Sequence, residues 1–452
     1  MLTQDATCFT VKGLFGKYNH TLDIPKSGDF KILFGYNGSG KTSIMRIIES
    51  FFSHDYSYIL KIPFKEANLL VKVSDNTYYN LKLTFNSEEY FIGEKIFDYK
   101  LSRIDSEGKE EIIIRSIYDN FKKSEEYRSA SRAYDRSIRG YDMIHDDDEF
   151  SGLDILKVFK SFYISENENK NTTNIKITNP SESYFIDTYR LRNNPHELLP
   201  DTPLYMRRWT RHIRDKEKVT KISEDIAGKI KEALAKYSKI SEELDRSYIF
   251  RAIESPLTST TYKKEYGDTI RNDYTEQLEF QQKVSKLVSE VELISEEYAI
   301  PENKIMNSRW TATFVKLYVE DSKKKFEPFV SLLNRIEKFI EIVNTRLVDK
   351  EIFISDQGIL IKKDDKDVLP VESLSSGEKH ELTILYTLLF DTHQGSIVFI
   401  DEPEISLHLL WQDKFIHDVQ DILNINNFCM IIATHAPAII GEHMGDKTVQ
   451  LS

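Results

Sequence analysis

Eight residues near the start of the chain have the spacing of a phosphate-binding loop. Residues 35–42 read GYNGSGKT and match the pattern GxxxxGK[ST], between a short apolar run and a segment with apolar side chains at helical spacing. Glycines let successive backbone N–H groups turn towards phosphate oxygens, and the N-terminus of the next helix adds a positive partial charge. We expect Lys41 to reach the β- and γ-phosphates and the Thr42 hydroxyl to ligate Mg²⁺. The complete consensus and its flanks disfavour the alternative, a chance glycine-rich turn. The candidate nucleotide-binding residues are Asn37, Gly38, Ser39, Gly40, Lys41, Thr42 and Ser43.

A pair of acids late in the chain supplies the complementary chemistry. Residues 397–400 read IVFI, as in a strand buried on both faces, and Asp401 and Glu402 follow directly. Nucleotide-binding α/β sheets present metal-ligating carboxylates at the C-terminal ends of such strands. We expect Asp401 to hold Mg²⁺ through water, and Glu402 to orient and polarise the attacking water. Taken alone, the pair is equally explained by an ordinary strand end with solvated acids, but it occurs together with a phosphate loop.

Two further segments complete the set of candidate site residues. Residues 374–379 read LSSGEK and open an amphipathic segment, so they predict a helix N-terminus that binds an anion without a lysine of its own. Such an end suits the γ-phosphate of a nucleotide held by another subunit; the alternative is a plain serine N-cap. Residues 431–437 read IIATHAP, and His435 at the end of this apolar run is either a γ-phosphate sensor or a structural histidine.

The elements that must position these residues predict an α/β fold. Residues 31–34, 184–186, 396–400 and 428–432 read as buried strands, and residues 60–115 alternate as antiparallel strands do. Residues 205–350 are rich in Lys, Glu, Leu and Ile and read as several helices, without a heptad pattern long enough for an extended coiled coil. A hairpin at 351–362 and a helix at 376–390 follow. The predicted parts of the chain are residues 1–200 (phosphate loop, β subdomain and a charged excursion at 120–150), 201–350 and 351–452.

The distance between the two halves of the site indicates an insertion. Glu402 follows Thr42 by 360 positions. Compact phosphate-loop ATPases place the acidic strand much closer to the loop. The middle segment, residues 201–350, is therefore expected to be a helical lobe inserted into one nucleotide-binding head.

The composition is that of a globular protein without a membrane span. The 452 residues include 61 Lys+Arg and 73 Asp+Glu, a formal net charge of −12, which argues against a protein that coats nucleic acid. The apolar runs are too short to cross a bilayer, and the N-terminus lacks the pattern of a signal peptide. The cysteines Cys8 and Cys429 form neither a disulfide framework nor a CxxC zinc clamp, so we expect a cytoplasmic location.

Together these motifs resemble the ordered motifs of ABC-type ATPases, in the branch that contains the SMC, RecF and OLD-like proteins. The run DEPE-x-SLH at residues 401–408, followed by Trp411 and Gln412, is typical of the OLD-like and defence-associated ATPases, as are residues 14–16 (LFG) and 185–190 (FIDTYR). The resemblance covers roughly residues 1–115, 180–195 and 350–450. It implies an ABC-type P-loop ATPase head with an antiparallel β subdomain and an inserted helical lobe.

The resemblance also implies roles for individual residues. In this family two protomers face each other head to tail, and each ATP lies between one phosphate loop and the partner's signature helix. Carried over, Ser375 and Gly377 contact the partner's γ-phosphate, Glu402 is the catalytic base and His435 is the sensor. Two positions depart from the family pattern, because Ser376 replaces a common glycine and Glu378 a common glutamine. The glutamine loop has no clear counterpart, and Thr188 or Arg190 is the weak candidate for it.

The function that the resemblance implies is regulatory. OLD nucleases carry a further nuclease domain, for which the residues after His435 leave too little chain, and SMC proteins carry a long coiled coil. We therefore expect a slow ATPase that is the sensor or regulatory subunit of a bacterial anti-phage complex and controls a separate nuclease or toxin. The most similar groups are the AriA-like ATPases of PARIS systems and then the PtuA-like ATPases of Septu systems. The alternatives are a RecF- or SMC-like DNA repair ATPase and a nucleotide-dependent scaffold.

The expected partners follow from the same reading. They are ATP and Mg²⁺, a second copy of the chain in a head-to-tail dimer or a larger assembly of dimers, the effector, and a phage-encoded trigger protein. DNA contact would depend on two basic stretches, residues 128–139 with four arginines at helical spacing and residues 206–221 with seven basic and two acidic side chains. Solvated helix faces are the simpler explanation of both stretches, and the acidic run at 145–149 is expected to be solvated.

Overall fold

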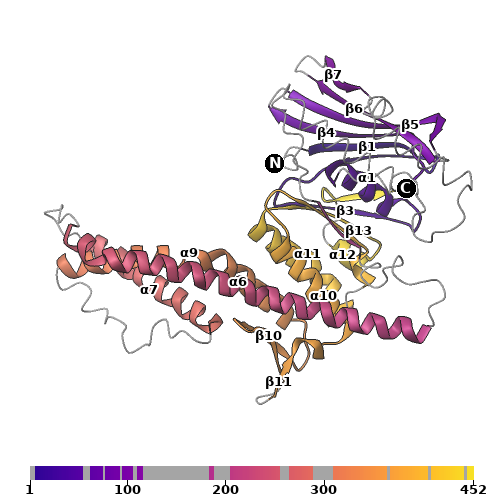
Figure 1. The fold of residues 1–452 in the computed structure, drawn as a ribbon. Coiled ribbons are helices and arrows are strands. Elements are labelled where there is room, and N and C mark those ends of the chain that lie inside the picture. Colours follow the sequence, from indigo (N-terminus) through magenta and orange to yellow (C-terminus); the bar gives the residue numbers. More distant parts are fainter. Residues whose placement is uncertain are drawn as a thin grey trace, which may run out of the picture. The chain divides into compact units, whose positions relative to one another are not determined.

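The computed structural model describes twelve ranges of the chain: residues 6–53, 62–74, 77–91, 94–104, 109–115, 183–187, 204–254, 264–288, 309–363, 367–405, 409–441 and 445–451. The chain forms two compact units (Figure 1). The first joins Met1–Glu197 to Asp391–Ser452, and the second is Leu198–Phe390. The second unit extends beyond the predicted insertion at 201–350, because the hairpin after residue 350 and the helix that follows it belong to it.

The first unit contains a five-stranded parallel sheet built from both ends of the chain. The strand order is β14-β3-β13-β12-β8, and every neighbouring pair is parallel. Every residue of β12 and of β13 is buried, as expected when helices or sheets cover both faces. The predicted buried strands are confirmed. The bounds are β3 (Phe30–Gly35), β8 (Ser183–Asp187), β12 (Ile397–Asp401), β13 (Cys429–Thr434) and β14 (Thr448–Leu451).

A second, antiparallel sheet covers helix α1 (Lys41–Ser53) on the side away from the parallel sheet (Figure 1). Its strand order is β2-β1-β4-β5-β6-β7, which confirms the predicted antiparallel β subdomain. Phe9, Leu69 and Leu83 point from this sheet into one core with Ile44 of α1 and Phe399 of β12. The bounds are β1 (Ala6–Leu14), β2 (Tyr18–Asp23), β4 (Glu66–Ser74), β5 (Thr77–Phe91), β6 (Glu94–Ile104) and β7 (Glu110–Arg115).

The remaining helices of the first unit lie between and after the strands of the parallel sheet. Helix α11 (Leu409–Asn426) connects β12 to β13, and the short helix α12 (Pro437–Ile440) follows β13. A 3-10 turn, η6 (Pro403–Ile405), separates β12 from the next described residues. The helix predicted from about residue 405 therefore begins later, since the chain first turns at Pro403.

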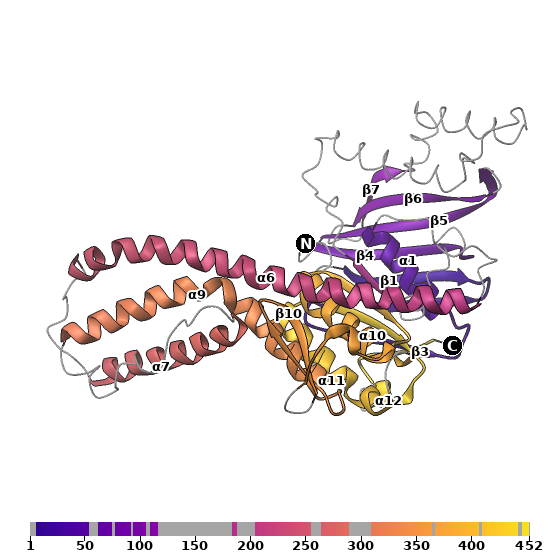
Figure 2. The same cartoon turned by 60° about the horizontal axis from the view of Figure 1, so that its bottom comes forward.

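The second unit contains three long helices, with α9 packed between α6 and α7 (Figure 2). The helices are α6 (Leu204–Glu254), α7 (Lys264–Leu287) and α9 (Arg309–Asn344). Helix α6 has 51 residues, which corresponds to about 75 Å. A single helix of this length was not predicted. Its sequence contains no proline, and a stripe of side chains with helical spacing is buried: Val219, Ile222, Ile226, Ile230 and Ala233.

A small antiparallel sheet and the helix α10 complete the second unit. The sheet contains β9 (Glu351–Ser355), β10 (Gly358–Lys363) and β11 (Asp367–Pro370), in the order β11-β10-β9, which confirms the predicted hairpin. After the 3-10 turn η4 (Val371–Ser373), α10 (Ser376–Tyr386) begins at the predicted residue. It ends earlier than predicted, because residues 387–391 form the π-helical turn η5 (Thr387–Asp391).

Polar contacts attach α10 to the long helices. The Tyr386 hydroxyl of α10 donates a hydrogen bond to Asp225 of α6. Arg346, just after α9, forms a buried ion pair with Glu381 of α10. Because an isolated charge is costly inside a protein, this pair favours one arrangement of α10 against the end of α9.

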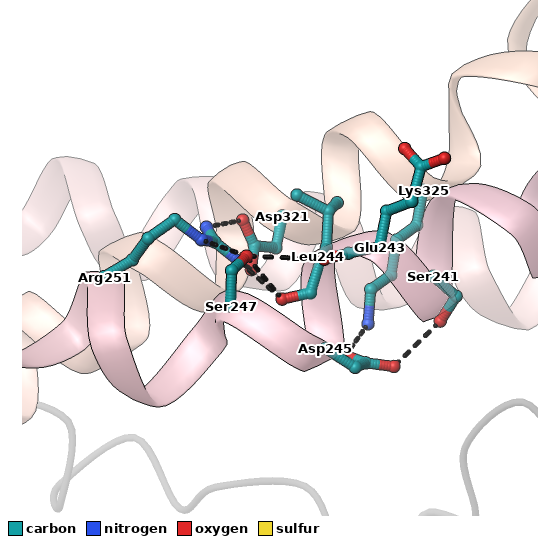
Figure 3. A network of polar contacts seen from close by, with 8 residues as sticks. All are labelled: Ser241, Glu243, Leu244, Asp245, Ser247, Arg251, Asp321 and Lys325. Atoms are coloured by element: carbon teal, nitrogen blue, oxygen red, sulfur yellow. Dashed lines mark hydrogen bonds and ion pairs between the residues drawn. The ribbon is translucent and has the colours of Figure 1, made fainter.

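Along α6 and α9, one polar network links the two helices far from α10 (Figure 3). The Arg251 guanidinium donates two hydrogen bonds to Asp321, at 2.6 and 2.7 Å, and a third to the carbonyl oxygen of Leu244. Hydrogen bonds to Asp321 raise the pKa of Arg251. Six residues before Arg251, Asp245 accepts hydrogen bonds from Lys325 and Ser241, and the Lys325 bond lowers the pKa of its carboxyl group.

We predict that Asp321→Ala destabilises the protein. The Asp321 side chain is only 5% exposed, and its removal leaves the partly buried Arg251 guanidinium without this carboxylate. Breaking such a pair lowers the free energy of unfolding by about 3–5 kcal/mol. The matched control is Asp273→Ala, which removes the exposed ion pair between α7 and Lys323 of α9 and costs at most about 1 kcal/mol. Urea unfolding of the full chain, followed by far-UV circular dichroism, measures both. An equal decrease in the free energy of unfolding in the two variants would contradict the prediction that the buried ion pair contributes more than the exposed one.

Candidate nucleotide-binding site

The phosphate loop lies between β3 and α1, as predicted. Gly35 ends β3, and Lys41 is the first residue of α1. The Lys41 ammonium folds back over the loop and donates hydrogen bonds to the carbonyl oxygens of Gly35, at 2.9 Å, and Tyr36, at 3.2 Å. Asn37 and Gly38 are exposed at the turn, whereas Ser39 is buried. The ammonium group thus contacts the backbone of the loop that is predicted to bind phosphate.

Gly40 is required by the space around it. Its φ of +91° disfavours other residues, and a Cβ atom there would lie 2.8 Å from Leu14 Cδ2. The same Cβ would lie 3.3 Å from the ring of Phe15, a half-exposed residue that also has a positive φ. Leu14 and Phe15 therefore pack against the back of the loop. Phe15, and the exposed Tyr36 within the loop, are site-lining aromatic residues to which the sequence motif assigned no role.

Thr42 of α1 contacts Asp401 at the C-terminal end of β12. The Thr42 hydroxyl donates a hydrogen bond of 2.7 Å to Asp401 Oδ2, although the two residues are 359 positions apart. Asp401 is the last residue of β12 and is 8% exposed. A hydroxyl and a carboxylate are oxygen ligands of the kind that Mg²⁺ prefers, and the hydroxyl would keep its proton while an oxygen lone pair binds the cation. The donor set therefore fits Mg²⁺.

The acids beyond β12 lie close to Lys41. Burial lowers the pKa of Lys41, and the negative charges of Glu402, Asp401 and Glu404 oppose that shift. Within the described ranges no group of three or more His, Cys, Asp or Glu side chains is arranged to hold a metal on its own.

Glu402 and His435 face each other at the ends of neighbouring strands. His435 Nε2 lies 3.5 Å from Glu402 Oε1, and both side chains are partly exposed. The Glu402 backbone has a φ of +51°, and its N–H donates to the carbonyl oxygen of Ala433 at 2.8 Å. A non-glycine residue in this region is strained and is kept there by its surroundings. The turn after β12 is thus held against the end of β13.

The predicted signature residues form a complete helix cap. Ser375 is the N-cap of α10: its Oγ accepts the N–H of Glu378, while the Glu378 carboxylate accepts the Ser375 N–H. Lys350 Nζ lies 3.2 Å from the same carboxylate. Burial alone would raise the pKa of Glu378, but the hydrogen bonds from Ser375 and Lys350 hold it below its usual value. Ser376 is exposed and Gly377 partly so.

The structure therefore groups the predicted site residues in two sets. The phosphate loop from Asn37 to Ser43, Asp401, Glu402 and His435 all belong to the first unit, and Ser375, Ser376, Gly377 and Glu378 belong to the second. Four predictions lie outside the described residues: the loop candidates Thr188 and Arg190, the motif residues Ser406, Leu407 and His408, the excursion at 120–150 with its arginines and acids, and the side chains of residues 206–217. In the described part of the chain, no helix has the length and apolarity of a membrane span.

Comparison with known proteins shows which group the chain belongs to. Protein ea59 of Escherichia phage lambda is 27% identical over 133 residues, which are 29% of this chain and 24% of that protein, so the match spans about a quarter of its length. The Smc head domain of Pyrococcus furiosus, solved with the C-terminal domain of ScpA, aligns over 96% of this chain and 91% of its own, with 15% identity and a TM-score of 0.34. The SMC head domain of Thermotoga maritima aligns over the same shares, with 9% identity and a TM-score of 0.32. A family model described as "AAA ATPase domain" matches residues 14–440, and this chain therefore belongs to the AAA ATPase domain family.

Proposed function

We propose that the chain binds ATP with Mg²⁺ in the first unit and hydrolyses it slowly. The observation that carries the proposal is the contact between Thr42 and Asp401, with Lys41, Glu402 and His435 at the same sheet edge. Lys41 and the backbone amides of the loop bind the β- and γ-phosphates. Thr42 and Asp401 hold the cation, which neutralises charge on the phosphates. Phe15 and Tyr36 offer aromatic faces beside the loop on which a base can stack.

Glu402 and His435 are the proposed catalytic residues. The Glu402 carboxylate accepts a hydrogen bond from the attacking water, orients it towards the γ-phosphorus and takes its proton as the new bond forms. The bond between the γ-phosphorus and the β–γ bridging oxygen breaks, and ADP leaves. His435, next to Glu402, donates a hydrogen bond to a γ-phosphate oxygen and stabilises the charge that develops there. Both residues are partly exposed, so water has access to them until the site is covered.

We propose that α10 of a second copy covers that site. The first backbone bond of α10 runs from Lys379 N–H to the Ser375 carbonyl, so the Ser376 and Gly377 amides precede the regular helical bonds. The Ser375 Oγ accepts the N–H of Glu378 and retains its own proton to donate outwards. A γ-phosphate can accept from these three donors. ATP would then lie between two protomers arranged head to tail.

The biological role that we propose is the sensor or regulatory subunit of an anti-phage complex, in which the nucleotide state controls a separate nuclease or toxin. The motif run at residues 401–408, which resembles that of the OLD-like and defence-associated ATPases, supports this role. A DNA repair ATPase of the RecF or SMC type is the competing role. The cytoplasm is the proposed location.

We predict that Glu402→Gln and Lys41→Ala separate hydrolysis from binding. Glu402→Gln removes the base and keeps the phosphate contacts, so kcat falls by about 100-fold or more while ATP stays bound and stabilises oligomers. Lys41→Ala removes charge from the phosphate site and abolishes ATP binding. Steady-state ATPase assays, calorimetric titration with ATP and analytical ultracentrifugation measure these effects. Equal ATP binding and equal turnover in wild type and Glu402→Gln would favour the nucleotide-dependent scaffold.

We predict that two inactive variants restore activity when mixed. Ser375→Arg blocks the signature end of α10, and Lys41→Ala blocks the phosphate loop. In a mixed head-to-tail dimer, one site combines the intact loop of the Ser375→Arg copy with the intact signature helix of the Lys41→Ala copy. ATPase assays of each variant alone and of the mixture test this. The absence of recovery, with exchange of subunits verified by differently tagged copies, would rule out a site shared between protomers.

The competing roles predict different responses to DNA. A repair ATPase should show DNA-stimulated hydrolysis that declines steeply with salt, since phosphate contacts release counterions. A defence regulator should instead bind the product of a neighbouring effector gene, with a difference between the ATP-bound Glu402→Gln form and the Lys41→Ala form. ATPase assays with duplex DNA at low and physiological salt, and co-purification with the neighbouring gene product, decide between them. Strong stimulation by DNA without effector binding would overturn the proposed defence role.

A further inference from the structure

One acid near the proposed catalytic pair has no role so far. Glu404 lies in the turn η6, two residues beyond Glu402, and its side chain is 11% exposed. Its Oε1 accepts a hydrogen bond of 2.9 Å from the backbone N–H of His435 and lies 3.8 Å from the imidazole Nε2. One carboxylate oxygen thus faces both the backbone and the ring of the same histidine.

The environment of Glu404 differs from that of a surface acid. Its Oε2 is buried and has no hydrogen-bond partner among the residues that the structure describes. Burying a carboxylate is unfavourable unless the contacts that it makes compensate. Its negative charge also acts on Lys41 and raises the pKa of that ammonium group, against the larger effect of burial. A carboxylate in this position is costly for the fold alone, which favours a role in the site.

The contacts around Glu404 connect two strand ends. Within the turn, the N–H of Ile405 donates to the Glu402 carbonyl at 3.1 Å, and Gln412 of α11 donates to the Glu404 carbonyl at 3.4 Å. On the other side, the N–H of Ala436 donates to Thr434 Oγ1 at 3.0 Å, immediately after β13. Between these two turns, Glu402 approaches the His435 ring, and the Glu404 carboxylate accepts the hydrogen bond from the His435 backbone N–H.

We propose that Glu404 is a positioning residue that holds His435 in place for its contact with the γ-phosphate, through the hydrogen bond to the His435 backbone. The inference rests on the proposed function. His435 follows a strand end and is 36% exposed, so its own packing does not fix the imidazole. Residues that orient metal-ligating histidines typically change affinity or activity by about 10- to 100-fold when they are lost, and we expect an effect of that size for a residue that orients His435. Glu404 itself contacts neither the nucleotide nor the attacking water in this assignment.

The test compares Glu404→Ala with Glu404→Gln. Glutamine keeps an oxygen that accepts the His435 N–H, and alanine does not. We expect Glu404→Ala to lower kcat by about 10-fold or more with the KM for ATP little changed, and Glu404→Gln to keep kcat within about 3-fold of wild type. Glu372→Ala is the control, because Glu372 is a half-buried acid that accepts a hydrogen bond from Thr220 in the second unit, and kcat should not respond to its loss. Thermal unfolding of each variant reports on folding.

A double-mutant cycle of kcat with His435→Ala distinguishes positioning of His435 from a purely structural role of Glu404. If Glu404 acts through His435, adding Glu404→Ala to His435→Ala changes kcat no further. The inference would be overturned if the double variant lost kcat by the product of the two single losses. It would also be overturned if Glu404→Gln were as slow as Glu404→Ala, or if Glu404→Ala changed only the KM for ATP. Its failure is distinct from failure of the proposed function, because the latter appears as a wild type without ATP turnover or as a His435→Ala variant with full activity.

Discussion

The hydrogen bond between Thr42 and Asp401 is the contact on which the proposed site depends. It joins the first turn of α1 to the end of β12 and so links residues from opposite ends of the chain. The contact forms because both ends of the chain supply strands to one parallel sheet, in which β13 lies between β3 and β12. Parallel strands end at the same edge, so the loop after β3, the acids after β12 and the histidine after β13 meet there.

This arrangement explains how a long insertion is tolerated. The second unit leaves the first after Glu197 and returns at Asp391, and it contains a core of its own between α6, α7 and α9. Such an insertion adds little closure entropy to the first unit, because the entropy of a loop grows only slowly with its length. The α10 helix contacts α6 through Asp225 and the end of α9 through Glu381, and it belongs to this inserted unit.

Local sequence patterns were sufficient to predict the candidate-site residues that lie in a recognisable loop or at the end of an apolar strand. Lys41 and Thr42 follow from a loop pattern, and Asp401 from a fully apolar strand, so the contact between their elements could be predicted. Glu404 could not be assigned, since its role depends on where the backbone of His435 lies, 31 positions away. The 51-residue helix α6 was also not predicted as one helix. Residue propensities indicate where a helix forms, but its length depends on packing against other elements, which the sequence does not show. Nor did any local pattern mark the end of α10 at Tyr386, where the chain changes to a π-helical turn.

The charges of the site explain why a partner would be needed for catalysis. Asp401, Glu402 and Glu404 place three carboxylates near the Lys41 ammonium, and their negative charge opposes the binding of a polyphosphate. A divalent cation bound by Thr42 and Asp401 offsets part of this negative charge. The amides of the phosphate loop add positive partial charge, and in the proposed dimer the N-terminus of a second α10 would add more, without a further ionisable group. In the proposed dimer the second α10 would contact the γ-phosphate, which ADP lacks, so ATP would favour the dimer more strongly than ADP does, and hydrolysis would release the two protomers.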